Sequence, residues 1–363
     1  MMFSRNTALM LALLLPACSG NTNPSNPAHV DASTPLVKGG ASDSGPSSDG
    51  GAPPCTATGY QGDELCLAPP AQGIQIHYGP KSYSAEDMKP FLLQPHQEMD
   101  ECVHVQTPND TELTFAETHV HLRTDAPTLL ASAESAPPAD PTACSQGGRL
   151  VVGGAGPSTD LFDTSDPDDA DLGMHIPAHA ALELHFHFVN DSDQPMLREA
   201  WINLVAKDGV TTGMGTIELL GGLTTAVPPK TTQVVTGTAA APQDLRIEAL
   251  EPYFHEHTRR LTAYKVAGGS KTKILEAYDA KAVKPVYFDT AHTNPSPDAD
   301  AGTQGAFSGL LQLKQGDQIE WECEVVNDLD TPIGFSQSFH TGEMCVLFGI
   351  YSPSDGRGWS AVQ

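Results

Sequence analysis

Apolar and polar residues alternate along much of the chain beyond Gly73. Runs such as GIQIHYG, AALELHFHFVN and GLLQLKQGDQIEWECEVV have the period of two that is typical of a β-strand with one buried face. Clusters of Pro, Gly, Asn and Asp separate these runs and predict turns. Helical periodicity is scarce, and the short stretch SAEDMKPFL is its best example. The pattern therefore predicts a mainly β protein.

The predicted strands fall into two groups of similar length. Short strands separated by turns are typical of β-sandwiches, and the stretch AKDGVTTG interrupts the series near residue 207. We therefore expect two tandem antiparallel β-sandwich domains of jelly-roll-like type. The N-terminal domain is predicted at residues 59–207 and the C-terminal domain at residues 208–354.

The N-terminus is predicted to be an export signal. The apolar run ALMLALLLPA follows Arg5 and, at ten residues, is too short to span a bilayer. The run ends in LPAC, which resembles a bacterial lipobox with Cys18 as the acylated residue. An ordinary cleaved signal is the alternative, because Pro16 is uncommon in a lipobox. Residues 1–18 are thus predicted to be a lipoprotein signal peptide, and no later stretch is expected to span a membrane.

Residues 19–58 are predicted to be a disordered linker. The segment is rich in Ser, Gly, Pro, Asp and Ala and has almost no large apolar residues, so it cannot bury a core. It would tether the folded body to a lipid anchor. The predicted location is therefore the envelope of a bacterium, at the outer membrane or facing the periplasm, with no other membrane contact.

The chain is strongly acidic, with 19 Lys and Arg against 45 Asp and Glu and a formal net charge of −26. Such a chain repels phosphate backbones, so nucleic acid is not expected as a partner. The expected partners are a small-molecule substrate and O₂, and the protein is expected to be a monomer.

Export changes the interpretation of the seven cysteines. Six remain once Cys18 is set aside, an even number that suits an oxidising compartment. Six cysteines allow fifteen pairings, and a partly reduced set is the alternative. Their order along the chain favours three local pairs, namely Cys55–Cys66, Cys102–Cys144 and Cys323–Cys345.

Two histidines stand one residue apart in the stretch YFHEHTRR, which we expect to be a strand. His255 and His257 would then point to the same face. Further along, Met344 precedes Cys345 in the stretch GEMC, where a disulfide would hold it. Thioether sulfur favours Cu(I) and imidazole suits both copper states. The three residues predict a copper site, although a polar strand face and a core methionine would explain them equally simply.

The second half of the chain resembles the C-terminal domain of copper type II ascorbate-dependent monooxygenases, the family of the peptidylglycine α-hydroxylating and dopamine β-monooxygenases. The resemblance covers roughly residues 75–354 and is weaker in the first half. The Thr of the family's G-x-T motif has no clear counterpart. The matching residues are, in order, His255, His257, Gly316, Asp317, Cys323, Gly334, Met344 and Cys345.

The resemblance implies that His255, His257 and Met344 bind the copper that activates O₂, with ascorbate or another reductant as electron donor. It also implies the Cys323–Cys345 bridge. The reaction would be hydroxylation of a C–H bond. The peptide-amidating branch grips its substrate with Arg, Asn and Tyr; the residues found here at these positions are Tyr253, Val346 and Phe348. We therefore expect a small or apolar substrate.

The family's N-terminal domain holds a second copper, and here the resemblance is incomplete. The later histidine of that site corresponds to His187, or to His185 if the register slips by two. The adjacent His-His pair aligns with Pro127 and Thr128 instead. The second site is thus predicted to be degenerate.

His119 and His121 lie nearby in the sequence and would rebuild the second site only if their strand neighbours that of His185 and His187. Two other functions stay open. In the first, the chain is a non-catalytic copper-binding surface lipoprotein that keeps the monooxygenase fold. In the second, it is a purely structural β-sandwich lipoprotein, and its histidines bind no metal.

Overall fold

The computed structural model describes residues 30–31, 58–123, 128–134, 144, 149–155, 158–162, 169–221, 226–289, 292, 302–356 and 358–362. Within these residues the protein is mainly β, with strands in five sheets and only short helical turns. The predicted fold class is confirmed. The predicted signal peptide with Cys18 lies outside the described residues, as does the linker up to residue 57 apart from β1 (Val30–Asp31), which pairs with Tyr78 and His77.

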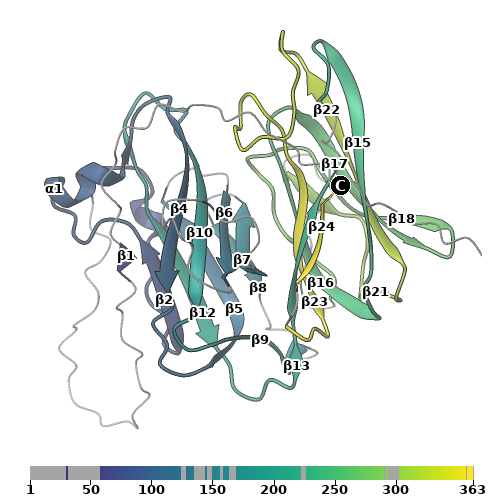
Figure 1. The fold of residues 1–363 in the computed structure, drawn as a ribbon, viewed down its shortest axis with the longest axis horizontal. Helices are drawn as coiled ribbons and strands as arrows, with labels where there is room; N and C mark the ends of the chain where they lie inside the picture. The colour runs from purple at the N-terminus through teal and green to yellow at the C-terminus, as the bar shows by residue number, and fades with distance from the viewer. Residues whose placement is uncertain are drawn as a thin grey trace, which may run out of the picture.

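Two sheets form the first sandwich (Figure 1). The first sheet has the order β1, β2 (Gly73–Tyr78), β12 (Ala200–Ala206), β5 (Leu113–Leu122), β9 (Leu172–Ile176) and β13 (Thr212–Gly213), with β8 (Ser158–Phe162) also on β5. The second has the order β4 (Glu98–Gln106), β10 (Ala181–Val189), β6 (Thr128–Ala133) and β7 (Arg149–Ala155).

The remaining elements of this half are short. They are the pair β3 (Leu92–Leu93) and β11 (Met196–Leu197), the 3-10 turns η1 (Asp63–Leu65) and η2 (Lys89–Phe91), and the helix α1 (Ala85–Met88). The helix lies within the predicted SAEDMKPFL stretch. The Ser84 side chain caps it by accepting a hydrogen bond from the Asp87 backbone N–H, which satisfies an otherwise unpaired first-turn donor.

Two further sheets form the second sandwich beside the first (Figure 1). One has the order β19 (Val286–Tyr287), β16 (Leu245–Phe254), β23 (Cys345–Ser352), β14 (Gly215–Leu220) and β24 (Trp359–Val362), with β21 (Leu311–Leu313) on β16. The other has the order β15 (Thr231–Ala240), β22 (Gln318–Asn327), β17 (Thr258–Ala267), β18 (Ser270–Ala277) and β20 (Thr303–Gly305). Among the described strands, all pairings are antiparallel except β9 with β13 and β14 with β24.

The alternating pattern of β10 explains how the first core forms. Leu182, Leu184, Phe186 and Phe188 are each at most 1% exposed and join one buried cluster. Full burial of such a side chain contributes about 1.5–3 kcal/mol. The intervening residues of β10 therefore point to the opposite face of the sheet, and His187 is one of them.

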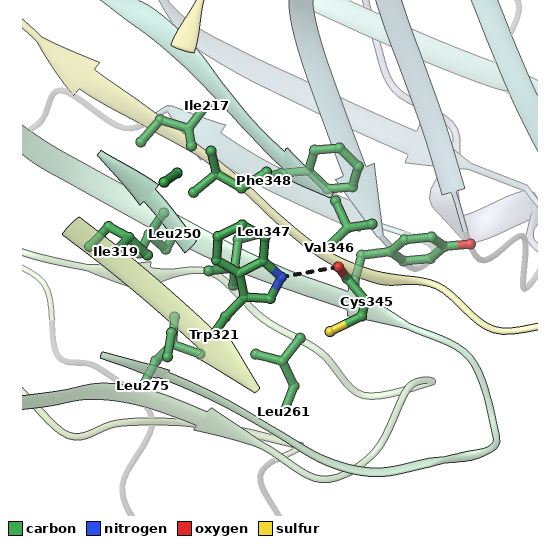
Figure 2. Close-up of a cluster of buried hydrophobic side chains, with 14 of the residues drawn as sticks. Ile217, Leu250, Leu261, Leu275, Ile319, Trp321, Cys345, Val346, Leu347 and Phe348 are labelled. Atoms are coloured by element: carbon green, nitrogen blue, oxygen red, sulfur yellow. Dashed lines mark hydrogen bonds between the residues drawn. The ribbon is translucent and has the colours of Figure 1, made fainter. Parts of the chain in front are cut away.

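Trp321 of β22 is the centre of the second core and is fully buried (Figure 2). Its indole Nε1 donates a hydrogen bond of 3.2 Å to the Cys345 carbonyl oxygen of the facing sheet. Gly237 lies opposite Trp321 on β15, and a Cβ at this position would come within 2.2 Å of the indole Cζ2. Only glycine leaves room for the ring here.

Two of the predicted disulfides are present in full. Cys102–Cys144 joins β4 to the segment after β6, and Cys323–Cys345 joins the two sheets of the second sandwich. Cys66 is disulfide-bonded as well, and its predicted partner Cys55 lies outside the described residues. The oxidised cysteines indicate an oxidising compartment outside the cytoplasm. No helix in the described part of the chain is long and apolar enough to cross a membrane.

The ends of the two sandwiches in the sequence differ slightly from the predicted domain bounds. β13 pairs with β9 and so extends the first sandwich past residue 208, while β24 extends the second past residue 354.

The two sandwiches are in direct contact with each other. β7 packs against β14 and β16, and Leu150 of β7 lies in the second core. This contact fixes the residues at the junction relative to one another.

Candidate metal centre

His255 and His257 do not share a strand face, so this part of the sequence prediction is wrong. β16 ends at Phe254, and β17 begins at Thr258 in the other sheet. The intervening residues form the turn by which the chain crosses between sheets, closed by a 3.2 Å bond from the Thr258 N–H to the His255 carbonyl. Both histidines therefore sit at a corner of the second sandwich.

His255 is completely buried. Its Nε2 is hydrogen-bonded to the Tyr253 hydroxyl at 3.0 Å, and its Nδ1 lies 3.4 Å from the Gly342 carbonyl. The pKa of His255 is lowered to about 3, mainly by burial and in smaller part by the neighbouring His187 and His257. The imidazole is therefore neutral at physiological pH, which is the state that a metal ligand requires.

The Glu343 carboxyl joins the turn after β16 to the segment before β23. Its Oε1 accepts hydrogen bonds from the backbone N–H of His255, at 2.5 Å, and of Met344, at 2.8 Å. Glu343 is fully buried, and this burial raises its pKa to about 8. The carboxyl thus holds the backbones of His255 and Met344 side by side. Met344 itself is 5% exposed and belongs to the second core.

His257 is half-buried, and its Nε2 is hydrogen-bonded to the His340 carbonyl oxygen at 2.9 Å. The His340 ring is held on both sides, with Nε2 2.9 Å from Asp191 and Nδ1 3.1 Å from Glu256. Partial burial lowers the pKa of His340, but the two carboxylates outweigh this effect and raise it overall. The two carboxylates thus favour the protonated form of His340, and the contact with Asp191 joins this loop to the residues that follow β10.

His187 belongs to the same site. It is 2% exposed on β10, and its ring stacks near that of His255, with centroids 6.1 Å apart and planes at 18°. Its Nδ1 is hydrogen-bonded to Asp100 at 2.6 Å. Its Nε2 lies 2.9 Å from Glu98 Oε1, although these atoms are not oriented for a hydrogen bond. The structure thus brings His187 and His255 together across the junction of the sandwiches.

Glu98 also holds the loop that leads to Met344. Its carboxylate accepts a hydrogen bond of 2.9 Å from the Ser338 hydroxyl and another from the Phe339 N–H. The Phe339 ring in turn packs against His255, with ring centroids 5.3 Å apart. No sequence pattern singles out Glu98 or Asp100, because each is a single acidic residue whose partners are remote in the chain, and Glu343 stands out only as the residue before Met344.

A second site rebuilt from His119, His121, His185 and His187 is excluded by the topology. His119 and His121 lie on β5, which pairs with β12, β8 and β9, whereas the neighbours of β10 are β4 and β6. The buried residues of both strands point into the first core, so these histidines point outward from opposite sheets. The core separates the two pairs.

The other residues implicated by the resemblance are also located. Thr128 begins β6 directly opposite His187, while Pro127 lies outside the described residues. His185 is opposite Cys102, and burial lowers its pKa. Three positions aligned with substrate-binding residues are at most 2% exposed and pack in the second core, so they line no open surface: Tyr253, Val346 and Phe348.

The chain matches no family model and no curated protein. Among solved structures it is similar to the STIV MCP, with 10% identity over 72% of this chain and 93% of that chain and a TM-score of 0.26. It is similar to PBCV-1 VP54, with 9% identity over 73% and 97% of the two chains and a TM-score of 0.23. A beta-porphyranase of glycoside hydrolase family 86 from Bacteroides plebeius gives 8% identity, coverages of 70% and 35%, and a TM-score of 0.15. TM-scores this low carry no argument about function.

Proposed function

We propose that the protein is a copper-dependent monooxygenase-like protein in which His255, His257 and Met344 hold one copper ion. The observation that carries the proposal is the Glu343 carboxyl, whose Oε1 accepts hydrogen bonds from the backbones of both His255 and Met344. His255 and Met344 are 89 positions apart in the sequence and are thereby neighbours at one corner of the second sandwich. His257 follows His255 in the same turn.

The donor chemistry of the corner suits copper. His255 is neutral because burial keeps its pKa at about 3, and a thioether beside imidazole suits Cu(I). Ligation would require His255 to exchange its contact with Tyr253 or with Gly342. In addition, His187 Nε2 is buried and has no hydrogen-bond partner among the described residues. A copper ion bound here would supply O₂ activation, with ascorbate or another reductant as electron donor.

The chain's own residues would have three tasks in hydroxylation. Glu343 fixes the relative position of the two ligand segments. Tyr253 shares a proton with His255 through their 3.0 Å hydrogen bond. The buried Phe339 ring covers the His255 imidazole and excludes water. The substrate would be small or apolar, because no arginine occupies the family's carboxylate-binding position.

The second copper site of the family would be degenerate in this chain. Asp100 already occupies Nδ1 of His187, and Glu98 lies beside Nε2. The register partner of His187 on the neighbouring strand is Thr128, not a histidine. This observation favours an alternative in which the chain binds copper without turnover, as a surface lipoprotein that keeps the fold.

Copper content and oxygen consumption distinguish these functions. The full chain is loaded with copper, dialysed and measured beside a His255→Gln variant. His119→Gln on the opposite sheet serves as the matched control. We expect the His255→Gln variant to retain one copper fewer than the parent and the control to equal the parent. Equal copper in His255→Gln and parent would refute the centre. Ascorbate-dependent O₂ uptake stimulated by small apolar compounds would separate an enzyme from a binding protein.

The lipid anchor is a further part of the proposal. LPAC after a short apolar run supports acylation of Cys18, and the disulfides agree with export. Intact mass of the protein extracted from membranes is the test. We expect a mature chain that begins at Cys18 and carries acyl mass. A chain that begins elsewhere, or that lacks this mass, would contradict the anchor.

A further inference from the structure

The outward face of β10 carries a second group of metal-ligand types at the end remote from His187. His104 of β4 is the direct cross-strand partner of Glu183 on β10. Val103, Val105, Leu182 and Leu184 point into the first core, so the side chains of His104 and Glu183 lie together on the other face. Glu134 follows β6 and is held next to β10 by its N–H, which donates to the Ala181 carbonyl at 2.9 Å.

The His104 ring lies between the two carboxylates. His104 Nδ1 is 3.0 Å from a Glu134 carboxylate oxygen, and His104 Nε2 is 3.8 Å from a Glu183 carboxylate oxygen. One ligand atom from each residue lies within 4.8 Å of the others. The group is also buried, with side-chain exposures of 12% for His104, 4% for Glu134 and 6% for Glu183. Two carboxylates buried so close together are costly unless a cation or proton lies between them.

We infer that His104, Glu134 and Glu183 form a binding site for a divalent transition-metal ion of the zinc type. Zn²⁺ binds histidine nitrogen and glutamate oxygen at about 2.0–2.2 Å, and tetrahedral geometry places such ligand atoms about 3.3–3.5 Å apart. An ion binds only one nitrogen of His104, whereas Glu134 contacts Nδ1 and Glu183 contacts Nε2. One carboxylate would therefore move toward the nitrogen that the other contacts, which brings ligand atoms that now lie within 4.8 Å of one another to this spacing. The ion would offset both carboxylate charges.

The ligand set decides the class of ion. A histidine nitrogen argues against Ca²⁺ and Mg²⁺, which take oxygen ligands. A thiolate ligand is excluded although Cys102, Cys144 and His185 also lie within metal-binding distance, because these cysteines are bonded to each other. The site is separate from the proposed copper centre, since His187 lies four residues beyond Glu183 on β10, which corresponds to about 13 Å along a strand.

The site would have a structural consequence. Glu134 and Cys144 flank the segment that follows β6, and both are held to β4, Glu134 through His104 and Cys144 through its disulfide to Cys102. A metal ion at Glu134 would therefore add a second fixed point at the start of this segment. Binding of an ion only to the folded state would raise its stability by mass action.

Zinc binding to the copper-free full chain tests the inference. The background carries His255→Gln and His257→Gln, so the result does not depend on the proposed copper centre. Equilibrium dialysis against Zn²⁺ is performed on this background and on versions that also carry Glu183→Gln or Glu134→Gln. His96→Gln is the matched control, because His96 forms an exposed pair with Asp193 at 2.9 Å.

We expect one Zn²⁺ per chain in the background and in the His96→Gln control. In the Glu183→Gln and Glu134→Gln versions, the zinc affinity should be at least tenfold lower. Zn²⁺ should raise the melting temperature of the background and not that of Glu183→Gln, and melting without metal shows whether each variant is folded. No bound zinc in the background, or equal zinc affinity in folded Glu183→Gln and Glu134→Gln, would overturn the site. The group would then be only a histidine ion-paired with two carboxylates.

Discussion

His187 and His255 face each other across the junction of the two sandwiches, with ring centroids 6.1 Å apart. One ring is carried by a strand of the first sandwich and the other by a turn of the second. Each is held by its own carboxyl group, Asp100 for His187 and Glu343 for the backbone of His255. His187 therefore lies at the proposed copper centre, although it belongs to the other sandwich.

This proximity predicts a paramagnetic effect. Binding of Cu²⁺ at His255 should broaden the imidazole signals of His187 beyond detection, because relaxation falls steeply with distance. The signals of His119 should persist, since the first core lies between its sheet and β10. The measurement is NMR of protein labelled in histidine, with Zn²⁺ as the diamagnetic control. Sharp His187 signals in the copper-loaded protein would show that the two rings are apart in solution.

A second prediction concerns the packing of Trp321. Gly237→Ala places a methyl group 2.2 Å from the indole Cζ2, so the ring or the strand must move. Overpacking of this kind costs about 1–3 kcal/mol or more, and we expect the free energy of unfolding to fall by at least that amount in urea titration. Gly334→Ala is the control, because its nearest atom would be the Ala226 Cβ at 3.9 Å. Equal stability of the two variants would contradict this account of the core.

Burial of Glu218 predicts a pH dependence of stability. Burial raises the pKa of this carboxyl in the folded state. A raised pKa means that the unfolded chain loses its proton first, so the stability contribution is complete below the unfolded pKa and declines as the pH rises toward the folded pKa. Glu218→Gln should remove that decline and be the more stable protein at pH 7. Urea titration from pH 4 to pH 8 measures the difference in the free energy of unfolding between the parent and Glu218→Gln, which should vanish at the acidic end. A difference that is the same at every pH would show that ionisation of Glu218 is not its cause.

The features that could be predicted from the sequence are those that depend on a local pattern of residues, such as single strands. Alternation in LELHFHFV made β10 recognisable, because a strand with one buried face must repeat every two residues. The same rule failed at His255 and His257, where the chain must turn to reach the other sheet after Phe254. Periodicity describes a strand and does not indicate where it ends.

Contacts between the sandwiches could not be predicted in the same way. The meeting of His187 with His255 depends on how two separately patterned bodies dock, for example through Leu150 of β7 in the second core. Strand order could not be predicted either. The sequence left open whether the strand of His119 neighbours β10, and the structure places it in the other sheet. Cys102–Cys144 and Cys323–Cys345 were predictable, since order along the chain already favours local pairs.

The thioether of Met344 gives the most direct test of the proposed centre. Met344→Ile keeps an apolar side chain of similar volume at a position 5% exposed in the second core. Such swaps usually cost less than 1.5 kcal/mol of stability. The substitution removes the soft sulfur and leaves both imidazoles, so Cu(I) affinity should fall at least tenfold while Cu(II) affinity changes much less.

Competition with calibrated Cu(I) and Cu(II) chelators gives both affinities for the Met344→Ile variant and the parent. Met174→Ile is the matched control, because Met174 is 2% exposed in the first core and the same swap there should alter neither affinity. Unchanged Cu(I) affinity in a folded Met344→Ile variant would remove Met344 from the ligand set. Equal losses for Cu(I) and Cu(II) would instead indicate that the substitution disturbs the Glu343 hydrogen bonds which hold His255 beside this segment.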